Sequence, residues 1–416
     1  MSDLLIAAGV ALLVSMLGTP LLITWLRAHK IGQQIRQDDG SIYYTTGVRR
    51  NDELRIWVGP QIRVDWLEQV GMDIPDTVDD LYNVLKAFKD QGVSDDPNFV
   101  PMTATKFRED YTFGLGIMCY PFGAAAEFMT DPTGTVVGYG PLEPEFKEAI
   151  AFIRKLVEDE LLDVNYVTNV RDDVDAMIVT GQAGFMHNTQ VTKLALLFEE
   201  QGIDNPFKPI PYFRGPNPTG ELATVYFPEA GANIMNNCLA VTTQAKDIEA
   251  AIRWVDFQYS DLGAEIRNFG IEGVSFTREG DERVLTDLVL QHPEWDVNTA
   301  TAVYTPAKVG VFTGIQLWES WKQSNHPDGV DCVYKYLSRV DQSQIMPPTS
   351  MTGEEQAEYA TIMADIETYF DETIDRIILG QLPLEHLDTM VNQMYSMGIE
   401  RAIELKQAAL DRYNQR

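Results

Sequence analysis

The chain is 416 residues long, with 45% hydrophobic and 23% charged residues. This composition is close to that of folded globular proteins and, at this length, allows about two or three domains, so wholesale disorder is excluded. The formal net charge is −30, from 62 acidic against 32 basic residues. Such a charge repels nucleic acid phosphates and anionic lipid headgroups, so we expect a solvated acidic surface and no nucleic acid partner.

The chain begins with an uncharged apolar run from Leu4 to Leu26, followed by the basic residues Arg27, Lys30 and Arg36. A helix of this length crosses a bilayer, and the basic flank favours a cytoplasmic position for the residues that follow it. A buried core helix is the alternative, but few soluble helices are apolar on every face. We therefore expect one N-terminal transmembrane helix with its basic flank within residues 1–40.

The same region carries recognisable words. Residues 5–15, 18–23 and 31–40 read LIAAGVALLVS, GTPLLI and IGQQIRQDDG. They resemble the first transmembrane helix and following loop of bacterial phospho-N-acetylmuramoyl-pentapeptide transferases. The resemblance stops near residue 40, and the later spans and acidic magnesium site of that family have no counterpart here. It therefore implies an inactive fragment fused to a different protein.

Helices follow in chain order, each predicted from a proline or capping residue and apolar residues at helical spacing. The first three begin near Pro75, Pro144 and Asp247. Their expected buried faces are Leu81, Val84, Leu85 and Phe88; Phe146, Ile150, Ile153 and Val157; and Ile248, Ile252, Val255 and Tyr259. Trp66 and Trp254 also lie on predicted helix faces and are expected in the core.

Three more helices are predicted near the C-terminus. The first contains residues 359–370 and stops near Gly380, the second contains residues 387–394 and ends at Gly398, and the third covers 402–413. Short apolar runs at 56–58, 183–186, 210–213 and 232–243 predict strands between the helices. Helices that alternate with short strands indicate layered α/β architecture.

Catalytic motifs are missing from the sequence. Gly114-Leu115-Gly116 is too short to indicate a dinucleotide-binding loop, and no two of the five histidines have metal-ligand spacing. The acidic residues at 172, 173 and 175 lack the glycine and final glutamate of a calcium loop and indicate a helix N-terminus instead. We therefore expect no enzymatic activity, no cofactor and no metal.

The three cysteines, Cys119, Cys238 and Cys332, are odd in number and far apart. Neither a disulfide framework nor a zinc site is supported by that spacing. We expect buried, chemically quiet thiols.

From about residue 40 onward the chain contains, in order, short sequence segments that are similar to a second family. Residues 59–67 read GPQIRVDWL, 70–75 VGMDIP, 251–257 AIRWVDF, 268–276 NFGIEGVSF and 398–404 GIERAIE. These words resemble the extracellular solute-binding proteins of ABC transporters (family 1), in their Gram-positive lipoprotein branch. The resemblance implies a type II periplasmic-binding-protein-like α/β fold, in which two lobes close on a solute.

That resemblance also suggests how the chain is organised. Residues 41–58 would be a remnant of the first lobe with the crossing strand, and 59–231 the second lobe. Residues 232–276 would return to the first lobe, and 277–416 would complete the second lobe and add C-terminal helices. In the family most of the first lobe precedes this crossing strand, so we expect a largely truncated first lobe and impaired closure, since unpaired strand edges would be exposed.

Candidate solute-binding residues are aromatic and polar side chains near predicted strand ends. Aromatic rings can cover the C–H faces of a sugar, while polar groups bond its hydroxyls. Each aromatic residue also has the alternative of a place in the core, Glu272 that of a turn cap, and His187 and Asn188 that of a surface turn. The candidates are Trp57, Phe185, His187, Asn188, Tyr226, Glu272 and Trp318, with Tyr212 and Phe227 as further aromatic residues.

The function implied is the solute-binding component of an ABC importer, which binds a carbohydrate or peptide-like solute, contacts the permease subunits and performs no chemistry. A membrane-tethered interaction protein and an inactive transferase fragment fused to a binding-protein fragment are the alternatives. The family places the soluble part outside the cytoplasm, tethered to the cell membrane by one N-terminal span. The basic flank at Arg27 to Arg36 favours the opposite side.

Overall fold

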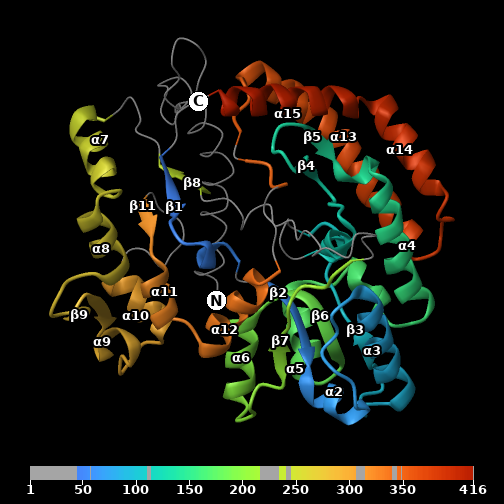
Figure 1. The fold of residues 1–416 in the computed structure, drawn as a ribbon, viewed down its shortest axis with the longest axis horizontal. Helices are drawn as coiled ribbons and strands as arrows, with labels where there is room; N and C mark the ends of the chain where they lie inside the picture. The colour runs from blue at the N-terminus through green and yellow to red at the C-terminus, as the bar shows by residue number, and fades with distance from the viewer. Residues whose placement is uncertain are drawn as a thin grey trace, which may run out of the picture.

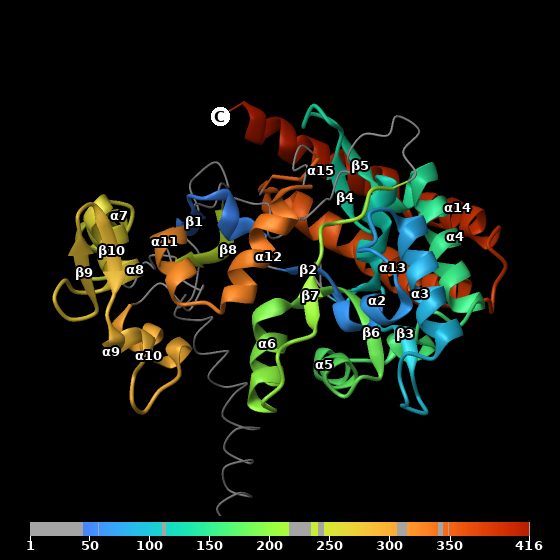
Figure 2. The same ribbon diagram turned by 60° about the horizontal axis from the view of Figure 1, so that its bottom comes forward.

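The computed structural model describes residues 45–56, 58–109, 114–215, 234–239, 245–305, 314–339, 344–347 and 349–415. The predicted N-terminal transmembrane helix lies outside these residues. Within them, no helix combines the length and apolar character that crossing a bilayer requires. The described residues form a larger and a smaller lobe, which lie side by side in both views of the ribbon (Figures 1 and 2).

The larger lobe is built on a four-stranded mixed sheet in the order β3-β6-β2-β7. The strands are β2 (Val58–Arg63), β3 (Val100–Met102), β6 (Ala183–Gln190) and β7 (Phe207–Pro209). β2 runs antiparallel to both of its neighbours, β6 and β7, whereas β3 runs parallel to β6. At one end of the sheet, therefore, lie the C-terminal ends of β3 and β6 and the N-terminal end of β2.

Helices surround this sheet. The helices of this part are α2 (Val64–Val70), α3 (Val78–Gln91), α4 (Pro144–Glu158), α5 (Arg171–Val179) and α6 (Val191–Glu200). Of these, α3 and α4 begin where the sequence predicts them. In α3 the Thr77 side chain accepts from the Asp80 backbone N–H while Asp80 bonds back to the Thr77 N–H, a reciprocal cap that fixes the helix start. Its apolar face, including Leu81, Leu85 and Phe88, is buried, as predicted.

Three C-terminal helices pack on the larger lobe, at the upper right of Figure 1. They are α13 (Gly353–Ile378), α14 (His386–Met397) and α15 (Ile399–Asn414), which contact α4 and the hairpin of β4 (Phe128–Thr130) and β5 (Val137–Tyr139). Ile366, Phe370 and Ile374 of α13 join the main core. Gly380 and Gly398 adopt positive φ angles after α13 and α14, which confirms both predicted helix ends.

The smaller lobe contains a three-stranded sheet in the order β11-β1-β8 and a two-stranded hairpin. Its strands are β1 (Thr45–Arg49), β8 (Ile234–Leu239), β11 (Gly314–Gln316), β9 (Phe276–Glu279) and β10 (Glu282–Leu285). Its helices are α7 (Ile248–Phe257), α8 (Asp261–Phe269), α9 (Asp287–Leu290), α10 (Val297–Tyr304) and α11 (Trp318–Gln323). Residues 277–305 and 314–323, which we placed with the second lobe, lie in this smaller lobe.

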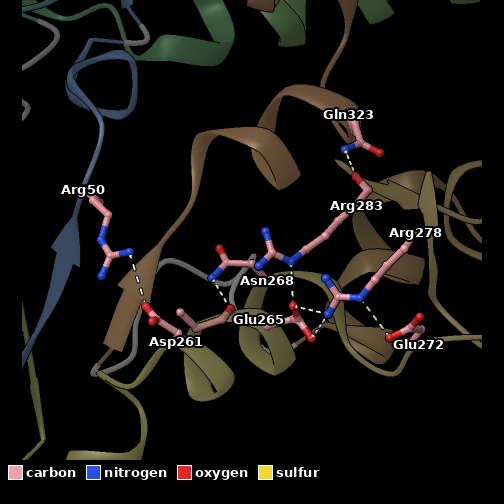
Figure 3. A network of polar contacts seen from close by, with 9 residues as sticks. Arg50, Asp261, Glu265, Asn268, Glu272, Arg278, Arg283 and Gln323 are labelled. Carbon is pink, nitrogen blue, oxygen red and sulfur yellow. Dashed lines mark hydrogen bonds and ion pairs between the residues drawn. The ribbon is translucent and has the colours of Figure 1, made fainter. Parts of the chain in front are cut away.

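Polar contacts bind the smaller lobe together (Figure 3). Arg278 and Arg283 both donate to the Glu265 carboxylate of α8, with N–O distances of 2.7 Å. The Asn268 amide donates to the Ile315 carbonyl of β11 at 2.7 Å. These contacts fix the hairpin and β11 against α8, and Phe269, Phe276 and Leu285 form a small core beside them.

The two lobes meet around the crossing strand β2. Helix α12 (Pro327–Leu337) packs on β2, β7, α6 and the short helix η1 (Asp52–Arg55). The Tyr212 hydroxyl donates to the Val58 carbonyl at 2.7 Å, and the Tyr336 hydroxyl donates to the Pro60 carbonyl at 3.3 Å. Both tyrosine side chains are buried, so water cannot replace these hydrogen bonds, and they hold the backbone of β2 in place.

Two expectations from the sequence are wrong in detail. Trp66 is buried as predicted, but Trp254 of α7 is 58% exposed, and Ile248 and Ile252 on another face of the same helix, also predicted in the core, are 47% and 54% exposed. The strand predicted at 210–213 lies instead at Phe207–Pro209. Pro211 interrupts the predicted run, since proline has no N–H to donate to a neighbouring strand.

Replacement of Tyr212 by Phe tests the support of β2. The Val58 carbonyl loses a buried hydrogen bond, so we expect the free energy of unfolding to fall by about 1–2 kcal/mol. Urea denaturation measures this change. The control is Tyr395→Phe on the exposed face of α14, which should change stability little. Equal stabilities of the two variants would contradict the role of the Tyr212 hydroxyl.

Candidate functional site

A pocket of about 240 Å³ lies beyond the end of β3, next to the 3-10 helix η2 (Leu115–Phe122). Three segments enclose it: residues 107–109, residues 114–120 and residues 126–127. Its apolar lining includes Phe107, Ile117 and Tyr120, and its charged lining consists of Arg108, Glu109 and Glu127. The pocket therefore offers aromatic surface and hydrogen-bonding groups together, as small-molecule sites usually do.

Glycine makes the close backbone packing of this pocket possible. The Leu115 N–H donates to the Lys106 carbonyl at 3.0 Å, and the Gly116 N–H donates to the Phe107 carbonyl at 2.9 Å. A Cβ atom on Gly114 would lie 2.5 Å from the Phe107 carbonyl oxygen. The Gly114-Leu115-Gly116 sequence thus lets two backbone segments approach each other and shape the pocket wall.

Charged residues from α13 support the pocket from behind. Arg108 lies 3.5 Å from Glu367 and 3.6 Å from Asp371 (shortest N–O distances), and burial raises the pKa of the Asp371 carboxyl. Inside the pocket, the Tyr120 hydroxyl donates to Glu127 Oε1 at 3.3 Å. The arginine is therefore held between carboxylates, and the tyrosine ring is oriented by its hydroxyl.

The arrangement suits binding better than bond cleavage. Within the described ranges no cluster of three or more His, Cys, Asp or Glu residues is placed to hold a metal ion. Asp172 and Asp175, at the start of α5, are ion-paired with Lys193 at 2.8 and 2.6 Å, which confirms a structural role for that acidic segment. Cys119 and Cys332 are free and buried, and burial raises the pKa of both thiols.

None of the sequence-predicted site residues whose side chains the structure describes lines this pocket. Phe185 is fully buried against Phe213, with ring centroids 5.7 Å apart. Trp318 is 7% exposed and stacks on Trp321 at 4.9 Å. Glu272 lies in the smaller lobe and is ion-paired with Arg278 at 3.1 Å, as Figure 3 shows.

His187 lies in the C-terminal half of β6, toward the end of the sheet that is next to the pocket. It is 4% exposed near the C-terminal end of β6, packed against the rings of Tyr212 and Phe213 at 5.6 and 6.0 Å. Neither ring nitrogen has a hydrogen-bond partner among the described residues, and burial lowers the pKa of His187 to about 3. The imidazole is therefore neutral at physiological pH.

The remaining predicted residues lie wholly or partly outside the described residues. Trp57, Tyr226 and Phe227 are outside them, and Asn188 is described only by its backbone in β6. Sequence reasoning missed Phe107, Arg108 and Tyr120, although a mixed aromatic and charged segment directly after a strand and before a Gly-x-Gly sequence was a usable signal.

The sequence profile of the bacterial extracellular solute-binding proteins matches residues 55–265, which is more than half of the chain. The chain belongs to this family. The match includes the crossing strand, the sheet of the larger lobe, the whole pocket and the first helices of the smaller lobe. The resemblance predicted from residues 59–75 and 251–257 is thereby confirmed at the level of the family.

Individual relatives are distant. The fructooligosaccharide ABC transporter substrate-binding protein FusA of Streptococcus pneumoniae is 22% identical over 366 residues, 85% of this chain and 65% of FusA. The polygalacturonan/rhamnogalacturonan-binding protein YtcQ of Bacillus subtilis is 21% identical over 88% of this chain and 69% of YtcQ. The chain thus spans about two thirds of the length of these relatives.

Solved structures confirm the fold. An extracellular solute-binding protein from Bifidobacterium longum subsp. infantis matches with a TM-score of 0.69 and 18% identity, over 91% of this chain and 78% of that protein. The mixed α/β, periplasmic-binding-protein-like architecture is therefore confirmed. The comparisons give no support to the transferase resemblance of residues 1–40 or to the expected loss of much of the first lobe.

Replacement of Gly114 by Ala tests the construction of the pocket wall. The added methyl group meets backbone oxygens of residues 106 and 107, so we expect a loss of about 1–3 kcal/mol in the free energy of unfolding. The control is Gly138→Ala in β5, where the nearest atom lies 3.4 Å from the added Cβ. Urea denaturation should separate the two variants, and an unchanged Gly114→Ala protein would contradict the packing described.

The buried His187 predicts a pH dependence of stability. Because its pKa is lower in the folded than in the unfolded chain, the unfolded state binds more protons as the pH falls below about 6.5, and the folded state loses stability. Between pH 7.5 and 5.5 this loss is about 1 kcal/mol per such histidine. We expect His187→Gln to remove it in urea titrations at both pH values. His386→Gln on α14 should retain the wild-type slope, and an unchanged slope in His187→Gln would contradict a buried neutral ring.

Proposed function

We propose that this chain is the solute-binding component of an ABC importer and that it binds an oligosaccharide in the pocket at η2, without chemical conversion. The observation that carries the proposal is the lining of that pocket. Phe107 and Tyr120 are only 3% and 4% exposed, and the accessible part of their rings lines the pocket where a C–H face of a sugar would lie. Arg108, Glu109 and Glu127 offer donors and acceptors for its hydroxyls.

The names of the relatives support a saccharide. FusA is named for fructooligosaccharides and has been crystallised with kestose, and YtcQ is named for two pectic polysaccharides. At about 20% identity these names indicate a class of solute and no individual sugar.

The proposed mechanism is closure of the two lobes on the solute. The described connections between the lobes include the segment from α11 to α12, which is short and suits a hinge. A solute that contacts both lobes would stabilise the closed state by its additional contacts there. Ligand residues predicted in the sequence, such as Asn188 and Trp57, remain predictions within this mechanism.

The partners follow from the same proposal. The closed protein would deliver its solute to ABC permease subunits from the extracytoplasmic side, and an N-terminal span would keep it at the cell membrane. Membrane sidedness is testable by protease accessibility of intact cells.

Ligand-induced stabilisation tests the function. A saccharide at 100 times its dissociation constant should stabilise the folded chain by about 2.7 kcal/mol, which appears as a raised melting temperature. Ala126→Phe, which places a ring in the pocket, should abolish this response, whereas Ala357→Phe on the exposed face of α13 should keep it. No response of the wild-type protein to any saccharide would contradict the function, and a full response of Ala126→Phe would contradict the site.

A further inference from the structure

The charges around the pocket distinguish between two classes of saccharide. The relatives are named for both neutral and acidic sugars, since fructooligosaccharides carry no charge and polygalacturonan carries a carboxylate on each galacturonate ring. A site for an acidic sugar needs a cation that is available to the ligand carboxylate, because a desolvated and unpaired charge is costly.

Arg108 is the cation in the described lining of the pocket, and its guanidinium lies between two carboxylates. Glu367 and Asp371 of α13 lie 3.5 and 3.6 Å from its guanidinium nitrogens. The other two charged residues of the lining are the carboxylates of Glu109 and Glu127. A ligand carboxylate beside Arg108 would therefore compete with two existing anions and face two more.

Cations farther from the pocket do not reverse this balance. Lys406 interacts electrostatically with Glu127 and Glu367, but it is largely buried and its ammonium lies 4.9 Å from the centre of the Tyr359 ring. Lys106 acts on Asp371 and Asp375 on the α13 side. Among the described residues, carboxylates still outnumber cations around the pocket, and the net charge of −30 adds to the repulsion of an anionic ligand.

The carboxylates of the lining are suited to hydroxyl groups instead. Ionised carboxylates accept hydrogen bonds and donate none, and bonds from hydroxyls to them are among the stronger ones in proteins. Oε2 of Glu109 is buried and accepts no hydrogen bond from the described residues. Glu127 is oriented by the Tyr120 hydroxyl, with its Oε1 as the acceptor.

We propose that the solute of this site is a neutral oligosaccharide and that Glu109 and Glu127 select it against uronate-containing oligosaccharides by accepting hydrogen bonds from ring hydroxyls. This inference rests on the proposed function. It adds the charge class of the solute and assigns the discrimination to two side chains of the pocket.

The test compares oligosaccharides of equal length by isothermal titration calorimetry on the full chain. The neutral set contains fructo-, galacto-, gluco- and xylo-oligosaccharides, and the acidic set contains galacturonate and alginate oligosaccharides. We expect at least one neutral oligosaccharide to bind at least tenfold more tightly than every acidic one. Raising the ionic strength should leave the neutral affinity unchanged, because screening acts only on charged pairs.

Two variants test the assigned residues. Glu127→Gln and Glu109→Gln keep the side-chain shape but remove the charge, so each should weaken neutral binding about tenfold and should not weaken the binding of uronates. Glu145→Gln, in the first turn of α4 outside the pocket, is the matched control and should bind like the wild type. Urea denaturation of each variant verifies that it is folded.

The outcomes distinguish failure of the neutral-sugar proposal from failure of the proposed saccharide-binding function. Acidic oligosaccharides that bind the wild type as tightly as neutral ones, or neutral affinities that both glutamine variants retain, would overturn the inference and leave saccharide binding in place. If no saccharide of either set binds, both the inference and the proposed function fail.

Discussion

The attachment of strand β2 is the constraint on which the rest of the structure depends. β2 is an inner strand of the larger sheet, between β6 and β7, and it directly follows the segment that comes from the smaller lobe. Buried hydroxyls of Tyr212 and Tyr336 bond to its first carbonyls, and Gly59 leaves room for the Tyr336 ring, which a Cβ atom would approach to 2.7 Å. The position of one lobe relative to the other thus depends on contacts to the backbone of the first residues of β2.

The same packing extends to the pocket. A hydrophobic cluster joins Leu54, Ile56 and Val58 at the crossing to Trp318 and Tyr336 on one side and to Ile117 and Tyr120 of η2 on the other. Tyr120 therefore contributes to the core at the junction of the lobes and to the lining of the pocket. A change in the relative position of the lobes would therefore move residues of the pocket wall, because this cluster is closely packed and transmits displacement.

Charge placement distinguishes the pocket from the surface around it. Many ion pairs of the described residues join two exposed side chains, such as Lys147 with Asp388, and contribute little to stability. Arg108 is one of the less exposed partners, since it is 20% exposed, and it lies between two carboxylates of α13 behind a half-enclosed pocket. Burying a charged side chain costs free energy. The charged residues at the pocket therefore say more about its ligand than the acidic excess of the whole chain does.

Much of the fold could be predicted from the sequence, because capping and spacing are local signals. The limits of α3 follow from Thr77, Asp80 and Gly92, and Gly398 ends α14 as expected. Tertiary context decided the rest. Trp254 lies on a regular amphipathic helix, yet whether a partner covers that face is not encoded locally.

The site was less predictable than the fold. Aromatic residues after strands looked equally suited to core and pocket, and the structure placed Phe185 and Trp318 in the core. The pocket instead depends on which loop faces η2 and on the close backbone approach at Gly114, which is a long-range property of the fold. His187, predicted from its position after a strand, is buried within β6 and does not line the pocket.

A crystal structure of the chain with its tightest-binding oligosaccharide tests the central claim most directly. The account predicts sugar density in the pocket at η2, with a ring against Tyr120 and hydroxyls bonded to the Glu109 and Glu127 carboxylates. Sugar density elsewhere on the molecule, with this pocket unchanged, would contradict it.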